Sequence, residues 1–72
     1  MDRSMHLRHL EEAERHVLLG VRNISDQEQR IEDLELHGRD ATLARSLLET
    51  YLCTQTLFVA HRNEILKALG EA

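Results

Sequence analysis

The sequence predicts an all-α fold, in which two long helices form an antiparallel, coiled-coil-like hairpin that self-associates into a four-helix bundle. The 72 residues include no proline, three glycines, two aromatic residues and thirteen leucines, a composition that favours helices over strands. The clearest cluster of turn-forming residues lies near the middle of the chain. Apolar residues recur at helical spacing on both sides of this cluster, which predicts one helix before it and one after it.

The turn is predicted at residues 38–40. Gly38 suits the left-handed position that ends many helices. Asp40 suits the position that precedes a helix, where its carboxylate accepts hydrogen bonds from the free amides of Thr42 or Leu43. A connection this short joins antiparallel neighbours. We therefore expect a single domain, residues 1–72, with helices at about 4–37 and 41–69.

The first helix carries a seven-residue apolar repeat, formed by Leu10, Val17, Ile24 and Ile31. Two core positions between these residues hold Gly20 and Gln27. A competing interpretation starts from Ser25 and Glu28, which match a helix-initiating capping box and would divide the segment into two helices of a three-helix monomer. The apolar repeat keeps its phase across Ser25, however, and this favours one continuous helix.

The second helix carries two apolar seams that lie side by side. We expect the first seam to pack on the first helix; its residues are Ala44, Leu47, Tyr51, Thr54, Phe58, His61, Ile65 and Ala68. The second seam is left for a partner, because a helix with two apolar stripes needs two neighbours. Its predicted interface residues are Leu48, Leu52, Val59, Leu66 and Leu69. A second copy of the chain is the expected partner, as a homodimer, and a helix of another protein is the alternative.

The position of the turn also predicts which core residues meet. In an antiparallel hairpin, residues equally distant from the turn lie at the same level. This places Phe58 opposite Gly20, where the absent side chain leaves room for the ring, and brings Tyr51 near Gln27. We therefore expect Gly20, Gln27, Tyr51 and Phe58 to belong to the core of the hairpin.

Charge and composition argue against several classes of protein. The formal net charge is −4 and lysines and arginines do not cluster, so we expect no nucleic-acid partner. No apolar run approaches the roughly 18 residues of a membrane span, and the first residues lack the apolar core of a signal peptide. The single cysteine, Cys53, excludes an internal disulfide. We expect a cytoplasmic protein with no membrane partner.

The sequence contains no recognisable catalytic motif, phosphate-binding loop or set of zinc-ligand cysteines, so we expect neither an enzyme nor a cofactor. Cys53 has no obvious activating neighbour and is predicted to be an inert thiol. The preferred function is a non-catalytic interaction or scaffold module. The alternative is a metal-binding helical bundle that uses the inward-facing His16 and His61, although the Glu-x-x-His motif of di-iron bundles is absent.

Most of the chain resembles a group of short proteins. The resemblance rests on the segment "HLEEAERHVLLGVRNISDQEQRIEDLELHGRDATLARSLLETY" and on "AHRNEIL" near the end. These residues resemble short uncharacterised helical-hairpin proteins of alphaproteobacteria, which share a heptad-like first helix and a turn with Gly, Asp and Thr. The resemblance implies a bacterial cytoplasmic setting, and it transfers no activity and no functional residues.

Overall fold

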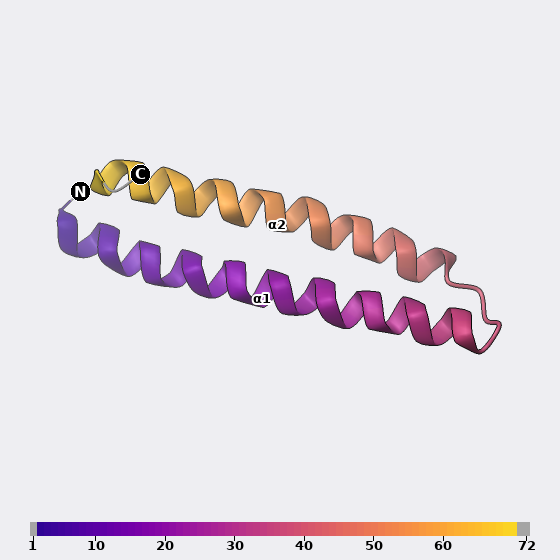
Figure 1. Cartoon of the computed structure of the whole chain (residues 1–72). Helices are drawn as coiled ribbons and strands as arrows, with labels where there is room; N and C mark the ends of the chain where they lie inside the picture. Colours follow the sequence, from indigo (N-terminus) through magenta and orange to yellow (C-terminus); the bar gives the residue numbers. More distant parts are fainter. Residues whose placement is uncertain (1, 71–72) are drawn as a thin grey trace.

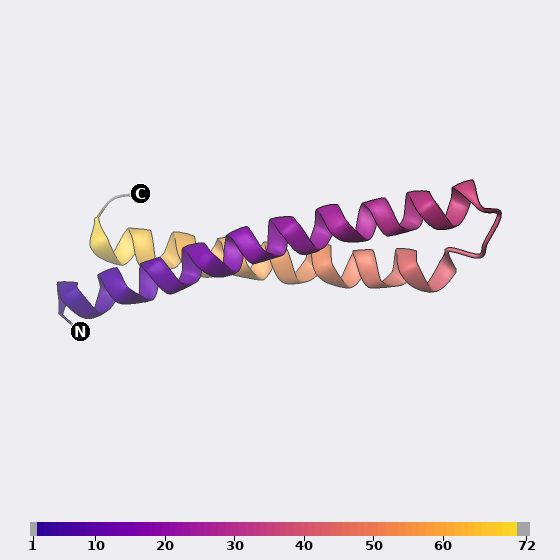
Figure 2. The same ribbon diagram turned by 90° about the horizontal axis from the view of Figure 1, so that it is seen from below.

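The hairpin is formed by two helices, α1 (Arg3–Leu36) and α2 (Thr42–Leu69), which lie side by side along their whole length (Figure 1). This computed structural model describes residues 2–70, and it contains no β-strand within that range. The molecule measures 54 × 16 × 14 Å. Viewed from below, the helices cross at a shallow angle, as they do in coiled-coil packing (Figure 2).

The helix α1 is continuous, which confirms the prediction from its apolar repeat. It begins after Asp2, whose side chain accepts a 2.8 Å hydrogen bond from the amide of Met5. It then passes through Gly20 and Ser25 without interruption. The capping-box pattern at Ser25 therefore starts no helix, because contacts with α2 on both sides of Ser25, at Val17 and Gln27, stabilise the helical conformation there.

The turn begins as predicted, with Gly38 in the left-handed conformation at φ +66°. The amide of Gly38 donates to the Glu35 carbonyl over 3.1 Å, and the amide of Arg39 donates to the Leu34 carbonyl over 2.8 Å. These two bonds form a Schellman motif, which satisfies carbonyls that the end of α1 leaves without partners. Only glycine adopts this conformation without steric cost, and this explains why the helix ends here.

The carboxylate of Asp40 organises the start of α2. Its Oδ1 atom accepts hydrogen bonds from the Thr42 amide over 3.0 Å and from the Thr42 hydroxyl over 2.6 Å. The predicted bond to Thr42 is thus present, although α2 begins one residue later than expected and Ala41 occupies the N-cap position. The hydrogen bonds from the hydroxyl and amide of Thr42, with a smaller contribution from Arg45, hold the pKa of Asp40 below its ordinary value.

We expect the contribution of Asp40 to stability to depend on pH. Because its pKa is lower in the folded state, the ionised carboxylate stabilises the fold at neutral pH, and protonation removes this contribution as the pH falls through the folded pKa. The melting temperatures of the wild type and Asp40→Ala should therefore differ at neutral pH and converge near about pH 2. Asp40→Asn serves as the uncharged control. An equal difference at both pH values would contradict the prediction.

The core between the helices is narrow and is built largely from small residues. Near the chain ends, Ala13 packs with Ile65 and Leu69, and the half-buried Leu10 covers this cluster. Near the turn, the buried residues are Ala41 and Ala44. Within residues 2–70, no large side chain is completely buried, and neither helix has an apolar stretch long enough to cross a membrane.

Candidate functional site

Two glutamine side chains cross the interface between the helices, one from each side. Gln27 of α1 is only 7% exposed and donates from Nε2 to the Ala44 carbonyl of α2 over 2.9 Å. Gln55 of α2 donates from Nε2 to the Val17 carbonyl of α1 over 3.0 Å. Because each amide reaches a backbone oxygen of the opposite helix, the two bonds fix the longitudinal register of the hairpin.

Gly20 lies where the side chain of Gln55 crosses α1. A Cβ atom at Gly20 would lie 1.6 Å from Oε1 and 2.6 Å from Cδ of Gln55, so the absence of a side chain makes room for this carboxamide. Oε1 is buried and accepts no conventional hydrogen bond. It occupies the position toward which a Cα hydrogen of Gly20 points, which is the arrangement of a weak Cα–H···O contact.

This arrangement corrects one contact predicted from the sequence. The sequence predicts Phe58 opposite Gly20, but Gln55 fills that space, and Phe58 stacks on His16 with the ring centroids 5.2 Å apart. The sequence also predicts Tyr51 near Gln27, and this contact stays a prediction; the Gln27 amide donates to the Ala44 carbonyl of α2. The residue opposite Gly20 is displaced by about one turn of α2, because the cross-helix amide bonds, and not the turn alone, fix the register.

The rotation of α2 about its axis also differs from the prediction. The helix α2 directs the strip between its two apolar seams toward α1. The residues in this strip are Ala44, Leu48, Tyr51, Gln55, Phe58, Arg62, Ile65 and Leu69. Leu47 and His61, predicted to face α1, are consequently exposed. Leu69, predicted to lie at the outer interface, is 9% exposed and packs in the core with Ala13. Because α2 packs on α1 through the strip between its two seams, some residues of each seam are buried and the others are exposed.

The other predicted interface residues remain on one flank of α2. Leu48, Val59 and Leu66 are half-buried, and Leu52 is 47% exposed. Helical spacing aligns these four residues along the helix. The 2.6 Å ion pair between Arg45 and Glu35 bridges the helices on this same side of the hairpin.

The neighbouring flank of α1 extends this apolar surface. Leu7 and Val21 lie on the side of α1 opposite to His9 and His16, which share a depression with the other flank of α2. Val21 is 54% exposed and Leu7 is also exposed. We call the combined surface the Leu52 face; it consists of Leu7, Val21, Leu48, Leu52, Val59 and Leu66. The contribution of α1 was missed in the sequence, since Leu7 and Val21 fall outside the seven-residue repeat.

Three histidines, His9, His16 and His61, lie on the opposite side of the hairpin from the Leu52 face. His16 and His61 line one depression of about 470 Å³, together with His9, Glu12, Ala13, Leu57 and Phe58. Within residues 2–70, no group of three or more histidine, cysteine, aspartate or glutamate side chains is arranged to hold a metal ion. His16 and His61, the two residues of the metal-binding alternative, thus lie beside one depression. Metal binding by this chain stays a prediction. Cys53 is an exposed free thiol.

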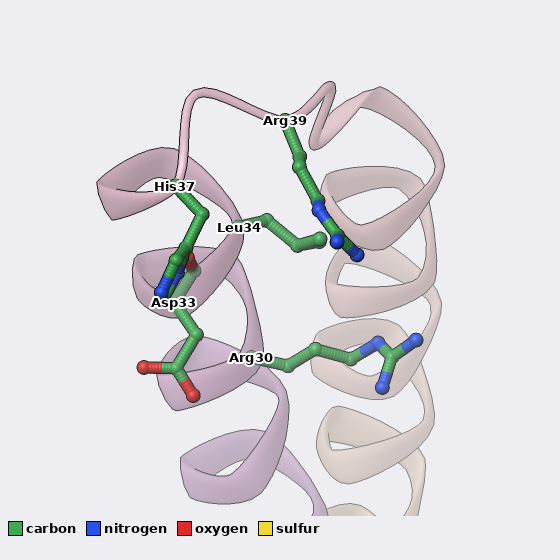
Figure 3. Close-up of a pocket in the computed structure, with 5 residues that line it drawn as sticks. All are labelled: Arg30, Asp33, Leu34, His37 and Arg39. Carbon is green, nitrogen blue, oxygen red and sulfur yellow. The ribbon is translucent and has the colours of Figure 1, made fainter.

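A second concavity, of about 350 Å³, lies next to the turn (Figure 3). The side chains of Arg30, Leu34 and Arg39 extend in the same direction, toward α2, whereas those of Asp33 and His37 point away from it. The Nδ1 atom of His37 donates to the Asp33 carbonyl over 2.7 Å. Two guanidinium groups and one carboxylate, that of Asp33, thus line this concavity.

No protein-family model, curated protein or solved structure matches this chain in comparisons with known proteins. What the chain does has to be inferred from its own surfaces, and the Leu52 face combines exposed apolar residues of both helices.

Proposed function

We propose that this chain is a non-catalytic interaction or scaffold module, which pairs with a second copy through the Leu52 face to form a four-helix bundle. The observation that supports the proposal is the face itself. Val21 and Leu52, from different helices, are each about half exposed and lie near the centre of an apolar strip along the hairpin. Exposed apolar residues that two helices place on one face are typical of a protein interface, and a twofold axis allows one such face to cover another.

The surface area of the chain supports the same proposal. A compact monomer of this mass exposes about 4,600 Å², from the scaling of surface area with mass. The hairpin exposes 5508 Å² at a mass of 8.4 kDa. The excess is about 900 Å², close to the ~800 Å² that each partner buries in a protein–protein interface of standard size. Pairing along the hairpin would remove this excess and supply the larger apolar core that a single hairpin lacks.

The proposal is tested by substituting one residue at the centre of the face. We expect the wild type to have twice the mass of the 8.4 kDa chain in light scattering at micromolar concentrations. Leu52→Glu should shift the protein to the monomer, because association would bury two unpaired carboxylates, one from each copy. A purely monomeric wild type at high micromolar concentration would refute the proposal.

Leu57→Glu is the matched control for this experiment. It introduces the same charge on the same helix, at a leucine that is 70% exposed and lies on the opposite flank beside the histidine depression. We expect this variant to remain dimeric. If Leu57→Glu dissociates the dimer and Leu52→Glu does not, the hairpins pair through the opposite face.

A further inference from the structure

The Leu52 face contains carboxylates as well as apolar side chains. One row of α1 consists of residues at seven-residue spacing, which are Leu7, Glu14, Val21 and Glu28. Residues with this spacing lie on the same side of a helix. Glu14 and Glu28 are both exposed. A second copy that covers the apolar residues of this row therefore also removes water from the two carboxylates.

Two more carboxylates border the face, one on each helix. Glu32 lies one turn beyond Glu28 on α1, and Glu49 lies about one turn before Leu52 on α2. Both residues are exposed. None of the four carboxylates on or beside the face forms an ion pair within residues 2–70. In the single hairpin, water stabilises their charges.

The charged groups of α2 nearest to Glu28 do not compensate it. The adjacent Gln27 bonds to the backbone of α2 near its start, so Glu28 lies level with the first turns of that helix. The charged residues of these turns on the same flank are Arg45 and Glu49. The guanidinium of Arg45 already lies 2.6 Å from a carboxylate oxygen of Glu35. The remaining charge is negative, like that of Glu28 itself.

Glu14 differs from Glu28, because an arginine of α2 lies near its level. The adjacent Ala13 packs with Ile65. Arg62 precedes Ile65 by about one turn, and its guanidinium donates to the side-chain oxygen of Asn63 over 3.3 Å. Covering a carboxylate together with a cation costs less than covering it alone. Pairing of two copies should therefore disfavour the charge of Glu28 more than that of Glu14.

A twofold axis makes the Leu52 face its own partner. Whichever way the second hairpin points, it brings the same set of charges to the interface. Of the groups that form no ion pair within residues 2–70, this set holds four carboxylates and one guanidinium, that of Arg62. The surface that covers Glu28 thus carries more negative than positive charge. Removing water from a carboxylate under these conditions is costly, and protonation avoids the cost.

We propose that self-association through the Leu52 face takes up protons, and that Glu28 is the principal site of this uptake. The inference rests on the proposed pairing of two copies and specifies how that pairing is regulated. The ionised form of Glu28 opposes pairing and the protonated form does not, so a dimer binds more protons than two separate hairpins. By linkage, the dissociation constant of the dimer falls as the pH falls.

The dissociation constant at two pH values tests the proposal. It is measured by light scattering over a dilution series at about pH 7.5 and about pH 5, at one salt concentration, with circular dichroism at 222 nm to follow the helices. We expect the dissociation constant to be about tenfold lower at the lower pH. A dimer whose dissociation constant is equal or higher at the lower pH would overturn proton uptake and leave self-association intact. A monomer at both pH values would overturn both.

A substitution isolates Glu28, because acidification also changes the charge of the rest of the chain. Glu28→Gln removes the charge and keeps the size of the side chain. At about pH 7.5 it should lower the dissociation constant toward the value that the wild type reaches at about pH 5, and it should weaken the dependence on pH. A weaker dimer would mean that Glu28 meets a cation of the partner subunit, which would overturn the proposal.

Glu12→Gln is the matched control. It makes the same change of charge on the same helix, beside the histidine depression on the other side of the hairpin. We expect this variant to keep the dissociation constant and the pH dependence of the wild type. If Glu12→Gln tightens the dimer as much as Glu28→Gln does, the charge of the whole chain governs pairing and the role of Glu28 is refuted.

Discussion

Replacing Ile65 by alanine is expected to lower the free energy of unfolding by about 2–4 kcal/mol. Ile65 is 7% exposed and packs with Ala13 and Leu69 in the apolar core cluster near the chain ends. The substitution removes three buried carbon atoms and leaves a cavity that two rigid helices close only in part. A domain of this size is stabilised by roughly 4–11 kcal/mol, so the loss is a large share of the total.

The measurement is chemical denaturation followed by circular dichroism at 222 nm, with each variant at the same protein concentration. Leu57→Ala is the matched control, because Leu57 is 70% exposed and its truncation should change stability by less than about 0.5 kcal/mol. If both variants lose the same amount, the packing of the hairpin differs from the one described. Equal slopes of the unfolding transitions would show that the comparison concerns the folded state and not the compactness of the unfolded chain.

Local signals in the sequence were sufficient to predict the helices and the turn. Gly38 ends α1 in a left-handed conformation that other residues adopt only at a cost, and Asp40 bonds to the amide that it was predicted to bond. The phase of the apolar repeat across Ser25 correctly predicted a continuous α1. Each of these features depends on residues within a few positions of one another, and short-range patterns record such features well.

The rotation and register of α2 could not be predicted in the same way. Its two apolar seams are similar in composition and lie side by side, so a small rotation exchanges residues between the core and the surface. Leu69 moves into the core and Leu47 moves out of it for this reason. The choice depends on contacts between residues far apart in the chain, above all the bond from Gln55 to Val17. The signal available in the sequence was Gln55, which with Arg62 is one of two polar residues in the second seam.

Replacing Gly20 by leucine is expected to lower the free energy of unfolding by about 2–3 kcal/mol. The first side-chain atom would lie 1.6 Å from Gln55 Oε1, so the carboxamide would have to leave the interface. Its hydrogen bond to Val17 would be lost, and the leucine would have to fit a seam shaped for glycine. The gain of about 1 kcal/mol in helix propensity offsets only part of this loss.

A double-mutant cycle identifies the residue that Gly20 accommodates. In a Gln55→Ala background the carboxamide is absent, so Gly20→Leu fills the vacated space and its cost should fall by about 1–3 kcal/mol. In a Phe58→Ala background the cost should be unchanged, because Phe58 stacks on His16 and the atoms nearest to a side chain at Gly20 belong to Gln55. If the cost of Gly20→Leu changed in the Phe58→Ala background and not in the Gln55→Ala background, the register predicted from the turn alone would be supported. Coupling to Gln55 would establish that the glycine makes room for an amide, and that this amide sets the level at which α2 meets α1.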